Sequence, residues 1–238
     1  MRGPPEAKLV GGVWLPVSER HFEEWMTSSK RAREVDGKLT YQYHKLEAAM
    51  AHQGRDRRRV CLDIGAHVGL WSMWLVREFA YVHAFEPVAA FAELFPFNVA
   101  MERVSLHRVA LGAEAKTVAI TVPLAQTGAA HVAGRDPVNV KYNPGGEMET
   151  HDGIEMRTLD SFAFKRVDFV KIDVEGYEVE VLRGAEQTIR RWRPNIVVEQ
   201  KGNEQAFGHE RDAALALLKS WGMRPLEVIS GDWIMGWP

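Results

Sequence analysis

The chain has 238 residues, the size of one α/β domain, and its 46% hydrophobic and 26% charged residues are ordinary for a soluble globular protein. Its 30 lysines and arginines against 32 acidic residues give a formal net charge of −2, which argues against a protein that binds nucleic acid by bulk charge. The single cysteine, Cys61, excludes an internal disulfide, and no Cys/His cluster has zinc spacing. We therefore expect a protein of a reducing, cytoplasmic setting, without a membrane span or a secretion signal.

The first 58 residues are expected to form an arm followed by a partly helical segment. Residues 1–12 are rich in glycine, proline and charge, which is typical of a loose chain end. Between Tyr41 and His52 apolar residues recur at helical spacing. We expect residues 1–58 to pack with a domain of residues 59–238 as one globular unit.

From residue 59 onward, short apolar runs rich in β-branched or aromatic side chains alternate with helical patterns. The expected strands are residues 59–64, 81–86, 104–109, 167–172 and 195–199. The expected helices are residues 70–79, 88–101, 178–191 and 210–221. This alternation predicts an α/β fold in which a parallel sheet carries helices on both faces. Near the end, residues 225–229 and 232–235 flank Ser230-Gly231 and predict an antiparallel hairpin.

Residues 123–153 do not fit the alternation, because they are rich in glycine and proline and have no strong period. Strand-like residues 117–122 and 154–159 flank them. Loops this long inside a compact domain are usually functional or disordered. Since ligands bind at the carboxyl ends of the strands in such sheets, we expect residues 123–153 to form a cover over the substrate that is mobile without it; the alternative is a surface loop packed elsewhere. Its polar residues suited to a hydroxylated substrate are Gln126, His131, Arg135, Asn139, Lys141 and Tyr142.

The strongest chemical signal is the heptapeptide DIGAHVG, which runs from Asp63 to Gly69 between the first strand and the first helix. Gly65 permits a backbone turn that a side chain would block, and Gly69 lets the helix start close to the sheet. The spacing D-x-G-x-x-x-G is not the dinucleotide fingerprint G-x-G-x-x-G. An acid beside such a turn suits a ligand with a cationic or amino group. The alternative is a structural turn that binds nothing.

Two further acidic motifs end strands. Glu86 ends the second strand, where a carboxylate can accept both hydroxyls of a ribose. Lys171, Asp173 and Glu175 close the fourth strand, and strand alternation turns the first two toward the same side. These charges are costly to bury unpaired, so we expect them to contact a ligand or each other. The alternative is a structural Lys–Asp pair with Glu178 on a solvated helical turn.

The motif order DIGAHVG, FEP, VALG, then TLDSF and VDFVKIDVEGYEVEVLRGA resembles the FkbM family of S-adenosylmethionine-dependent methyltransferases over about residues 58–200. The resemblance implies the class I methyltransferase fold, a Rossmann-like, mostly parallel sheet of seven strands. It implies cofactor contacts of the methionine portion with Asp63, Gly65 and Gly69, of the ribose with Glu86, and of the adenine with Val109-Ala110. Asp173 then lies beside the transferred methyl. The full predicted cofactor set is Asp63, Gly65, Ala66, His67, Gly69, Leu70, Glu86, Pro87, Val109, Ala110 and Asp173.

Methyl transfer to a hydroxyl requires alignment of donor and acceptor and removal of a proton. Asp173, Glu175 and Lys171 are the catalytic candidates, and the sequence does not rank them. His67 and His131 are further possible bases, although a lone histidine is more often structural. A metal at Asp173 and Glu199 is not expected, because the sequence after strand five lacks the Asp-Asn pair of catechol-type enzymes.

The leading hypothesis is therefore O-methylation of a hydroxyl on a small molecule, sugar or glycan, with S-adenosylmethionine as donor. One alternative is methylation of a nucleic-acid ribose 2′-hydroxyl, for which Lys171, Asp173, Glu199 and Lys201 offer lysines and acids; the near-neutral charge disfavours it. The other is a nucleoside-binding module without catalysis. The acceptor and the oligomeric state are not readable from the sequence.

Overall fold

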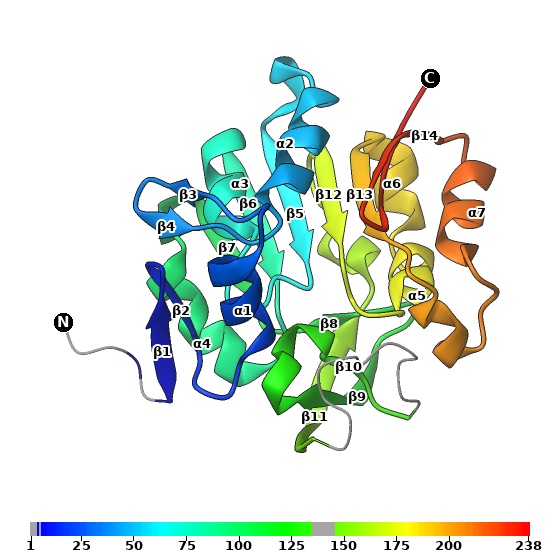
Figure 1. Cartoon of the computed structure of the whole chain (residues 1–238). Coiled ribbons are helices and arrows are strands. Elements are labelled where there is room, and N and C mark those ends of the chain that lie inside the picture. Colours follow the sequence, from blue (N-terminus) through cyan, green and yellow to red (C-terminus); the bar gives the residue numbers. More distant parts are fainter. Residues whose placement is uncertain (1–3, 5, 135–145) are drawn as a thin grey trace.

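The computed structural model describes residues 4, 6–134 and 146–238, and its centre is a seven-stranded sheet (Figure 1). The strands follow the order β14-β15-β13-β12-β5-β6-β7. Their bounds are β5 (Val60–Ile64), β6 (Tyr81–Phe85), β7 (Val104–His107), β12 (Phe169–Ile172), β13 (Asn195–Glu199), β14 (Arg224–Ile229) and β15 (Asp232–Gly236). The five strands from β13 to β7 run parallel, and β15 pairs antiparallel with β13 and β14. The predicted mostly parallel sheet with a terminal antiparallel hairpin is confirmed.

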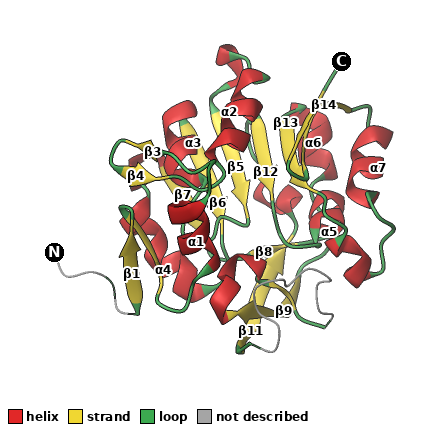
Figure 2. Ribbon diagram, in the orientation of Figure 1, coloured by secondary structure: helices red, strands yellow, loops and turns green. Residues whose placement is uncertain are grey.

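Helices cover both faces of this sheet (Figure 2). Their bounds are α1 (His21–Ser28), α2 (Tyr43–Ala51), α3 (Ser72–Glu78), α4 (Ala89–Asn98), α5 (Glu178–Arg183), α6 (Glu186–Trp192) and α7 (Ala213–Ser220). Alternate residues of β5 divide between two cores: Cys61 packs in one core with residues of α1 to α4, and Leu62 packs in the other with residues of α5 to α7. The period-two strand pattern thus produces a three-layer fold.

The N-terminal segment contains two short hairpins. Strand β1 (Ala7–Val10) pairs antiparallel with β2 (Val13–Pro16), and the buried side chains of Val13 and Leu15 join the core shared with α3 and α4. A second short hairpin joins β3 (Glu34–Val35) to β4 (Lys38–Leu39). The expectation of a loose arm over residues 1–12 is therefore wrong for residues 7–12, because this short hairpin has a hydrophobic core to pack against.

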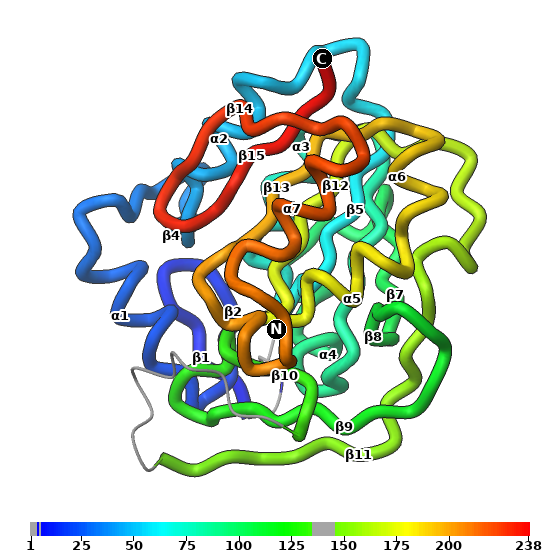
Figure 3. The backbone as a smooth tube through the Cα atoms, turned by 90° about the vertical axis from the view of Figure 1, so that its right-hand side faces the viewer, coloured from blue at the N-terminus to red at the C-terminus, as the bar shows by residue number. Residues whose placement is uncertain are grey.

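A second sheet lies beneath the carboxyl ends of the central strands, in the order β10-β9-β11-β8 (Figure 1). Its strands are β8 (Ala110–Leu111), β9 (Lys116–Pro123), β10 (His131–Val132) and β11 (Met148–Arg157), and the 3₁₀ helix η3 (Leu124–Ala129) follows β9. Figure 3 shows β9 and β11 running side by side, as their antiparallel register requires. The prediction of one long loop over residues 123–153 is therefore wrong for residues 124–132 and 148–153. Residues 148–153 are mostly exposed, so they lack the apolar alternation that marks a strand. Four of the polar residues assigned to the cover lie outside the described residues: Arg135, Asn139, Lys141 and Tyr142.

The single helix expected over residues 178–191 is two helices, α5 and α6. Gly184 lies between them, where an added Cβ would come within 2.0 Å of the Gly112 carbonyl oxygen. The Asp160 carboxylate then accepts the backbone N–H groups of Gln187 and Thr188, which starts α6. The remaining 3₁₀ helices are η1 (Arg55–Arg57), η2 (Met101–Arg103), η4 (Leu159–Phe162) and η5 (Asn203–Phe207). Within the described residues, no helix has the length and apolar character needed to span a membrane.

Candidate active site

A cavity of about 690 Å³ opens at the carboxyl edge of the central sheet, where β5 separates the strands that continue toward β6 from those that begin at β12. Cavities that bind small molecules usually measure roughly 300–1,000 Å³, and this one lies within that range. In open α/β sheets the ligand site lies at such a switch point. All the predicted site residues line the cavity except Asp63 and Gly69. Those that line it are Gly65, Ala66, His67, Leu70, Glu86, Pro87, Val109, Ala110, Lys171, Asp173 and Glu175.

The turn after β5 brings bare backbone to the floor of the cavity. Gly65 has φ +76°, and an added Cβ would lie 1.9 Å from the carbonyl oxygen of Asp173. The N–H groups of Gly65 and Ala66 donate to the Phe85 carbonyl, which fixes the turn against β6. A side chain at position 65 would therefore strike the neighbouring strand end. Gly69 instead packs on α4, where its Cβ would lie 2.4 Å from Val99, and not on the sheet as expected.

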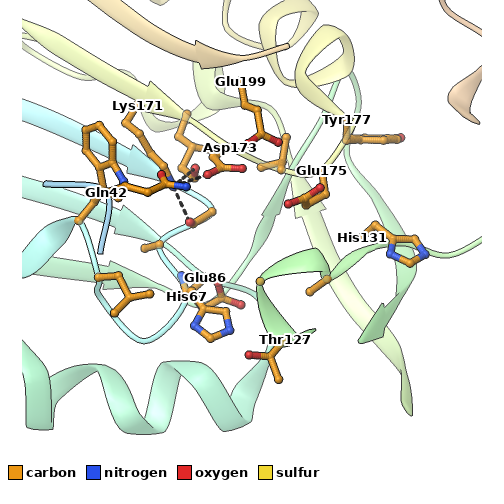
Figure 4. Close-up of a pocket in the computed structure, with 18 of the residues that line it drawn as sticks. Gln42, His67, Glu86, Thr127, His131, Lys171, Asp173, Glu175, Tyr177 and Glu199 are labelled. Carbon is orange, nitrogen blue, oxygen red and sulfur yellow. Dashed lines mark hydrogen bonds and ion pairs between the residues drawn. The ribbon is translucent and has the colours of Figure 1, made fainter. Parts of the chain in front are cut away.

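Asp63 lies behind the cavity and holds Lys171. Its side chain is 0% exposed, accepts a hydrogen bond from Ser72 Oγ at 2.6 Å, and lies 3.4 Å from Lys171 Nζ. Lys171 Nζ also donates to the Gly65 carbonyl at 2.7 Å and lies 3.9 Å from an Asp173 carboxylate oxygen (Figure 4). Burial opposes the charge of Lys171, yet Asp63 and Asp173 raise its pKa. A permanent ammonium group therefore links the two acids, and the Lys–Asp pair anticipated from the sequence is present.

Glu86 ends β6 and faces the same cavity. Its two carboxylate oxygens accept the backbone N–H groups of His67 and Val88, each at 2.8 Å. Burial raises its pKa to about 7, although both hydrogen bonds favour the charged form. Burial lowers the pKa of His67 to about 3, so this imidazole is neutral and is a poor proton acceptor.

Three carboxylates meet above the end of β12. Oxygens of Asp173, Glu175 and Glu199 lie within 4.8 Å of one another. Lys201 donates a hydrogen bond to Glu199, and Asn203 Nδ2 donates to Glu175 at 2.8 Å. Burial and the neighbouring acids raise the pKa of Glu175 well above its usual range, and that of Glu199 to about 7. The ammonium groups of Lys171 and Lys201 balance part of this charge, so we assign no metal to the cluster.

Glu178 is buried, and the expectation of a solvated helical turn is wrong. Its carboxylate accepts the backbone N–H groups of Val174 and Gly176 at 3.2 and 3.1 Å. Burial raises its pKa to about 8. The residue therefore folds the turn that carries Glu175 into the cavity. The sequence spacing E-G-x-E contains this contact, but nothing in the sequence distinguishes it from a solvated first turn.

The N-terminal segment supplies a wall that the sequence did not indicate. Phe22, Trp25 and Tyr41 line the cavity, and their rings form edge-to-face contacts with centroids 4.6 and 4.9 Å apart around Tyr41. Gln42 comes from the same segment and lies on the Lys171 side of the cavity in Figure 4. Trp71 is buried and also lines the cavity. Residues brought together only by tertiary packing leave no spacing signal, so sequence reasoning had no means to find this wall.

The N-terminal wall is tied to η3 by one buried carboxylate. Glu19 is 0% exposed and accepts hydrogen bonds from the Phe22 N–H at 2.7 Å, the Thr127 N–H at 2.6 Å, and the Thr127 hydroxyl. Arg20 N–H donates to the Ala125 carbonyl, which adds a backbone link. Thr127 lies at the floor of the view in Figure 4, opposite the carboxylates. The described part of the cover is thus held against α1.

We expect Glu19→Gln to loosen this part of the cover. The amide offers one acceptor oxygen where the carboxylate offers two, so one buried N–H or O–H donor loses its partner at a cost of about 1–3 kcal/mol. Hydrogen exchange of the Thr127 and Phe22 amides and the melting temperature measure the effect. Glu24→Gln, on the exposed side of α1, is the control and should change neither the exchange nor the melting temperature. Equal exchange in both variants would show that Glu19 does not hold the cover.

The chain is similar in sequence to known methyltransferases. A family model described as the methyltransferase FkbM domain matches residues 63–225. The chain is 28% identical over 190 residues to "Methyltransferase 1" of Beauveria bassiana (strain ARSEF 2860), covering 72% of this chain and 74% of the relative. It is 25% identical over 171 residues to "Methyltransferase sdnD" of Sordaria araneosa, covering 58% of this chain and 64% of that protein. A solved FkbM methyltransferase from Methylobacillus flagellatus KT aligns with a TM-score of 0.46 at 17% identity, over 75% of this chain and 43% of that one.

The family match identifies an α/β methyltransferase, and the cavity lies at the carboxyl edge of its sheet. More particularly, the chain belongs to the FkbM methyltransferase family, whose model matches well over half of it. The resemblance drawn from the motifs between Asp63 and Ala185 is confirmed.

Proposed function

We propose that this protein transfers the methyl group of S-adenosylmethionine to a hydroxyl of a small molecule, sugar or glycan. The observation that carries the proposal is the Gly65 turn, which leaves bare backbone between Glu86 on one side and the Lys171–Asp173 pair on the other. A ligand lying along this backbone has Glu86 at one end, where the carboxylate can accept hydrogen bonds from ribose hydroxyls, and the Lys171–Asp173 pair at the other. Membership of a methyltransferase family supports the same donor.

Each part of the cofactor has a matching part of the cavity. The backbone around Gly65 and His67 suits the methionine portion, Glu86 and Pro87 suit the ribose, and the apolar Val109-Ala110 pair suits the adenine. Asp63 and Gly69 act from behind the cavity: Asp63 orients Lys171, and Gly69 allows α4 to pack closely. When bound, the cofactor supplies a methyl group on a positively charged sulfonium.

Asp173, Glu175 and Lys171 form the proposed catalytic group. The acidic side chains of Asp173 and Glu175 bring carboxyl oxygens to the cavity, and such oxygens complement a sulfonium. Lys171 forms an ion pair with Asp173 and donates a hydrogen bond to the Gly65 carbonyl. It therefore links Asp173 to the backbone turn at the floor of the cofactor site. The aromatic wall of Phe22, Trp25 and Tyr41 excludes water from the acceptor side.

Incubation with methyl-labelled S-adenosylmethionine against separate pools of metabolites, glycans and RNA tests the proposal. We expect alkali-stable label in the metabolite or glycan pool, since an ether linkage resists base. Label in RNA would instead favour the alternative in which the acceptor is a ribose 2′-hydroxyl. Binding of the cofactor without transfer to any pool would indicate a nucleoside-binding module.

A further inference from the structure

Glu199 is a cavity carboxylate outside the catalytic group of the leading hypothesis, although the ribose 2′-hydroxyl alternative counts it among its acids. It ends β13 beside β12, its side chain is 4% exposed, and it lines the cavity. Lys201 donates a hydrogen bond to its Oε1 atom. In Figure 4 its carboxylate points toward Asp173 and Glu175, with which it shares the cluster of oxygens within 4.8 Å.

We propose that Glu199 accepts the proton of the acceptor hydroxyl, and that Lys201 is its positioning residue. The inference rests on the proposed methyl transfer. In the step, the acceptor oxygen forms a bond to the methyl carbon as the carbon–sulfur bond breaks, and that electron pair stays on sulfur. The hydroxyl proton passes to a Glu199 carboxylate oxygen. The products are a methyl ether, a neutral thioether and a protonated Glu199.

The three acids have different partners. Asp173 lies 3.9 Å from the buried ammonium group of Lys171, which Asp63 and the Gly65 carbonyl also hold. Glu175 accepts a hydrogen bond from Asn203, and burial and the neighbouring acids raise its pKa well above the usual range. Glu199 has a pKa of about 7, which suits a group that must take up and release a proton near neutrality.

Charged groups lie on the elements that neighbour Glu199. Lys171 lies on β12, Asp173 and Glu175 lie on the turn after it, and Glu178 begins α5. On β15 Asp232 stands opposite Glu199 in register, paired with Lys45 of α2, and Lys201 lies on its own segment. Burial raises its pKa most, then Asp173, while Lys201 lowers it. Removing Lys201 should therefore raise the pKa of Glu199 further.

Proton release on ligand binding tests the inference without an acceptor. A sulfonium beside Glu199 lowers its pKa, so binding of S-adenosylmethionine at pH 7 should release protons that binding of S-adenosylhomocysteine does not. Calorimetry in two buffers of different ionisation enthalpy measures the release. We expect the difference between the two ligands in the wild type and in Glu204→Gln, and its loss in Glu199→Gln. Glu204 is equally buried but does not line the cavity.

Kinetics with an acceptor from the labelled screen provide the second test. Glu199→Gln should lower kcat about 100-fold and remove the acid limb of the pH profile, while Glu199→Asp recovers part of the rate. Lys201→Met should shift that limb to higher pH. Unchanged proton release in Glu199→Gln, or no release in a wild type that binds the cofactor, overturns the role of Glu199. Failure of the wild type to bind the cofactor overturns the proposed function itself.

Discussion

Replacing Gly65 by alanine is expected to abolish measurable binding of S-adenosylmethionine. The Cβ would lie 1.9 Å from the Asp173 carbonyl oxygen, a backbone atom that no rotamer change moves away. Either the turn after β5 or the end of β12 must shift, and both form the floor of the cavity. We expect the Kd to rise at least about 100-fold, equivalent to about 2.7 kcal/mol. Calorimetric titration of the variant measures the loss.

Gly153 provides a matched control for this substitution. Its φ of +73° is close to the +76° of Gly65, but nothing lies within 4 Å of its added Cβ. Gly153→Ala therefore carries the same backbone strain without the collision, and cofactor affinity should remain that of the wild type. If Gly65→Ala binds as tightly as Gly153→Ala, the turn does not form the cofactor site.

Asp173→Asn is expected to preserve the fold and to remove most turnover. The side chain is 24% exposed and its contact with Lys171 is long, at 3.9 Å, while Lys171 keeps its closer acidic partner Asp63. Loss of a charge aimed at the reacting centre typically costs about 10²–10³ in kcat. We expect that loss with an unchanged melting temperature. Steady-state kinetics with an acceptor from the labelled screen and thermal unfolding measure the two quantities.

Asp63→Asn should instead destabilise the fold. Its side chain is fully buried, and removing its charge leaves the ammonium group of Lys171 without its nearest carboxylate. Breaking a buried ion pair in this way typically costs about 3–5 kcal/mol. We expect a clear fall in melting temperature for this variant.

Wild-type turnover in Asp173→Asn would make Asp173 structural and transfer its role to Glu175 or Lys171.

The central sheet was predictable because its strands are buried on both faces. The expected strand over residues 195–199 coincides with β13, whose five side chains are almost all buried. The exposed residues 148–153 of β11 carry no such pattern, so their strand was missed. The break between α5 and α6 depends on contact of Gly184 with Gly112, two residues far apart in the chain.

The cofactor side of the cavity was also predictable, because its residues lie in short motifs at the ends of strands. Gly65, Glu86 and Asp173 each directly follow a strand of the central sheet (β5, β6 and β12), and the parallel sheet brings these strand ends to one edge. The acceptor side was not predictable in the same way. Phe22 and Thr127 come to the same cavity only through packing of α1 on η3, with Glu19 as the link. No local pattern records such a contact.

Titration of the wild-type protein with S-adenosylmethionine tests the central claim most directly. The cavity at the end of β5 should bind one molecule per chain with a Kd in the micromolar range. Binding should be lost in Gly65→Ala and kept in Gly153→Ala. A wild type that shows no heat of binding in any buffer, while folded by its melting curve, would contradict the assignment of this cavity to the methyl donor.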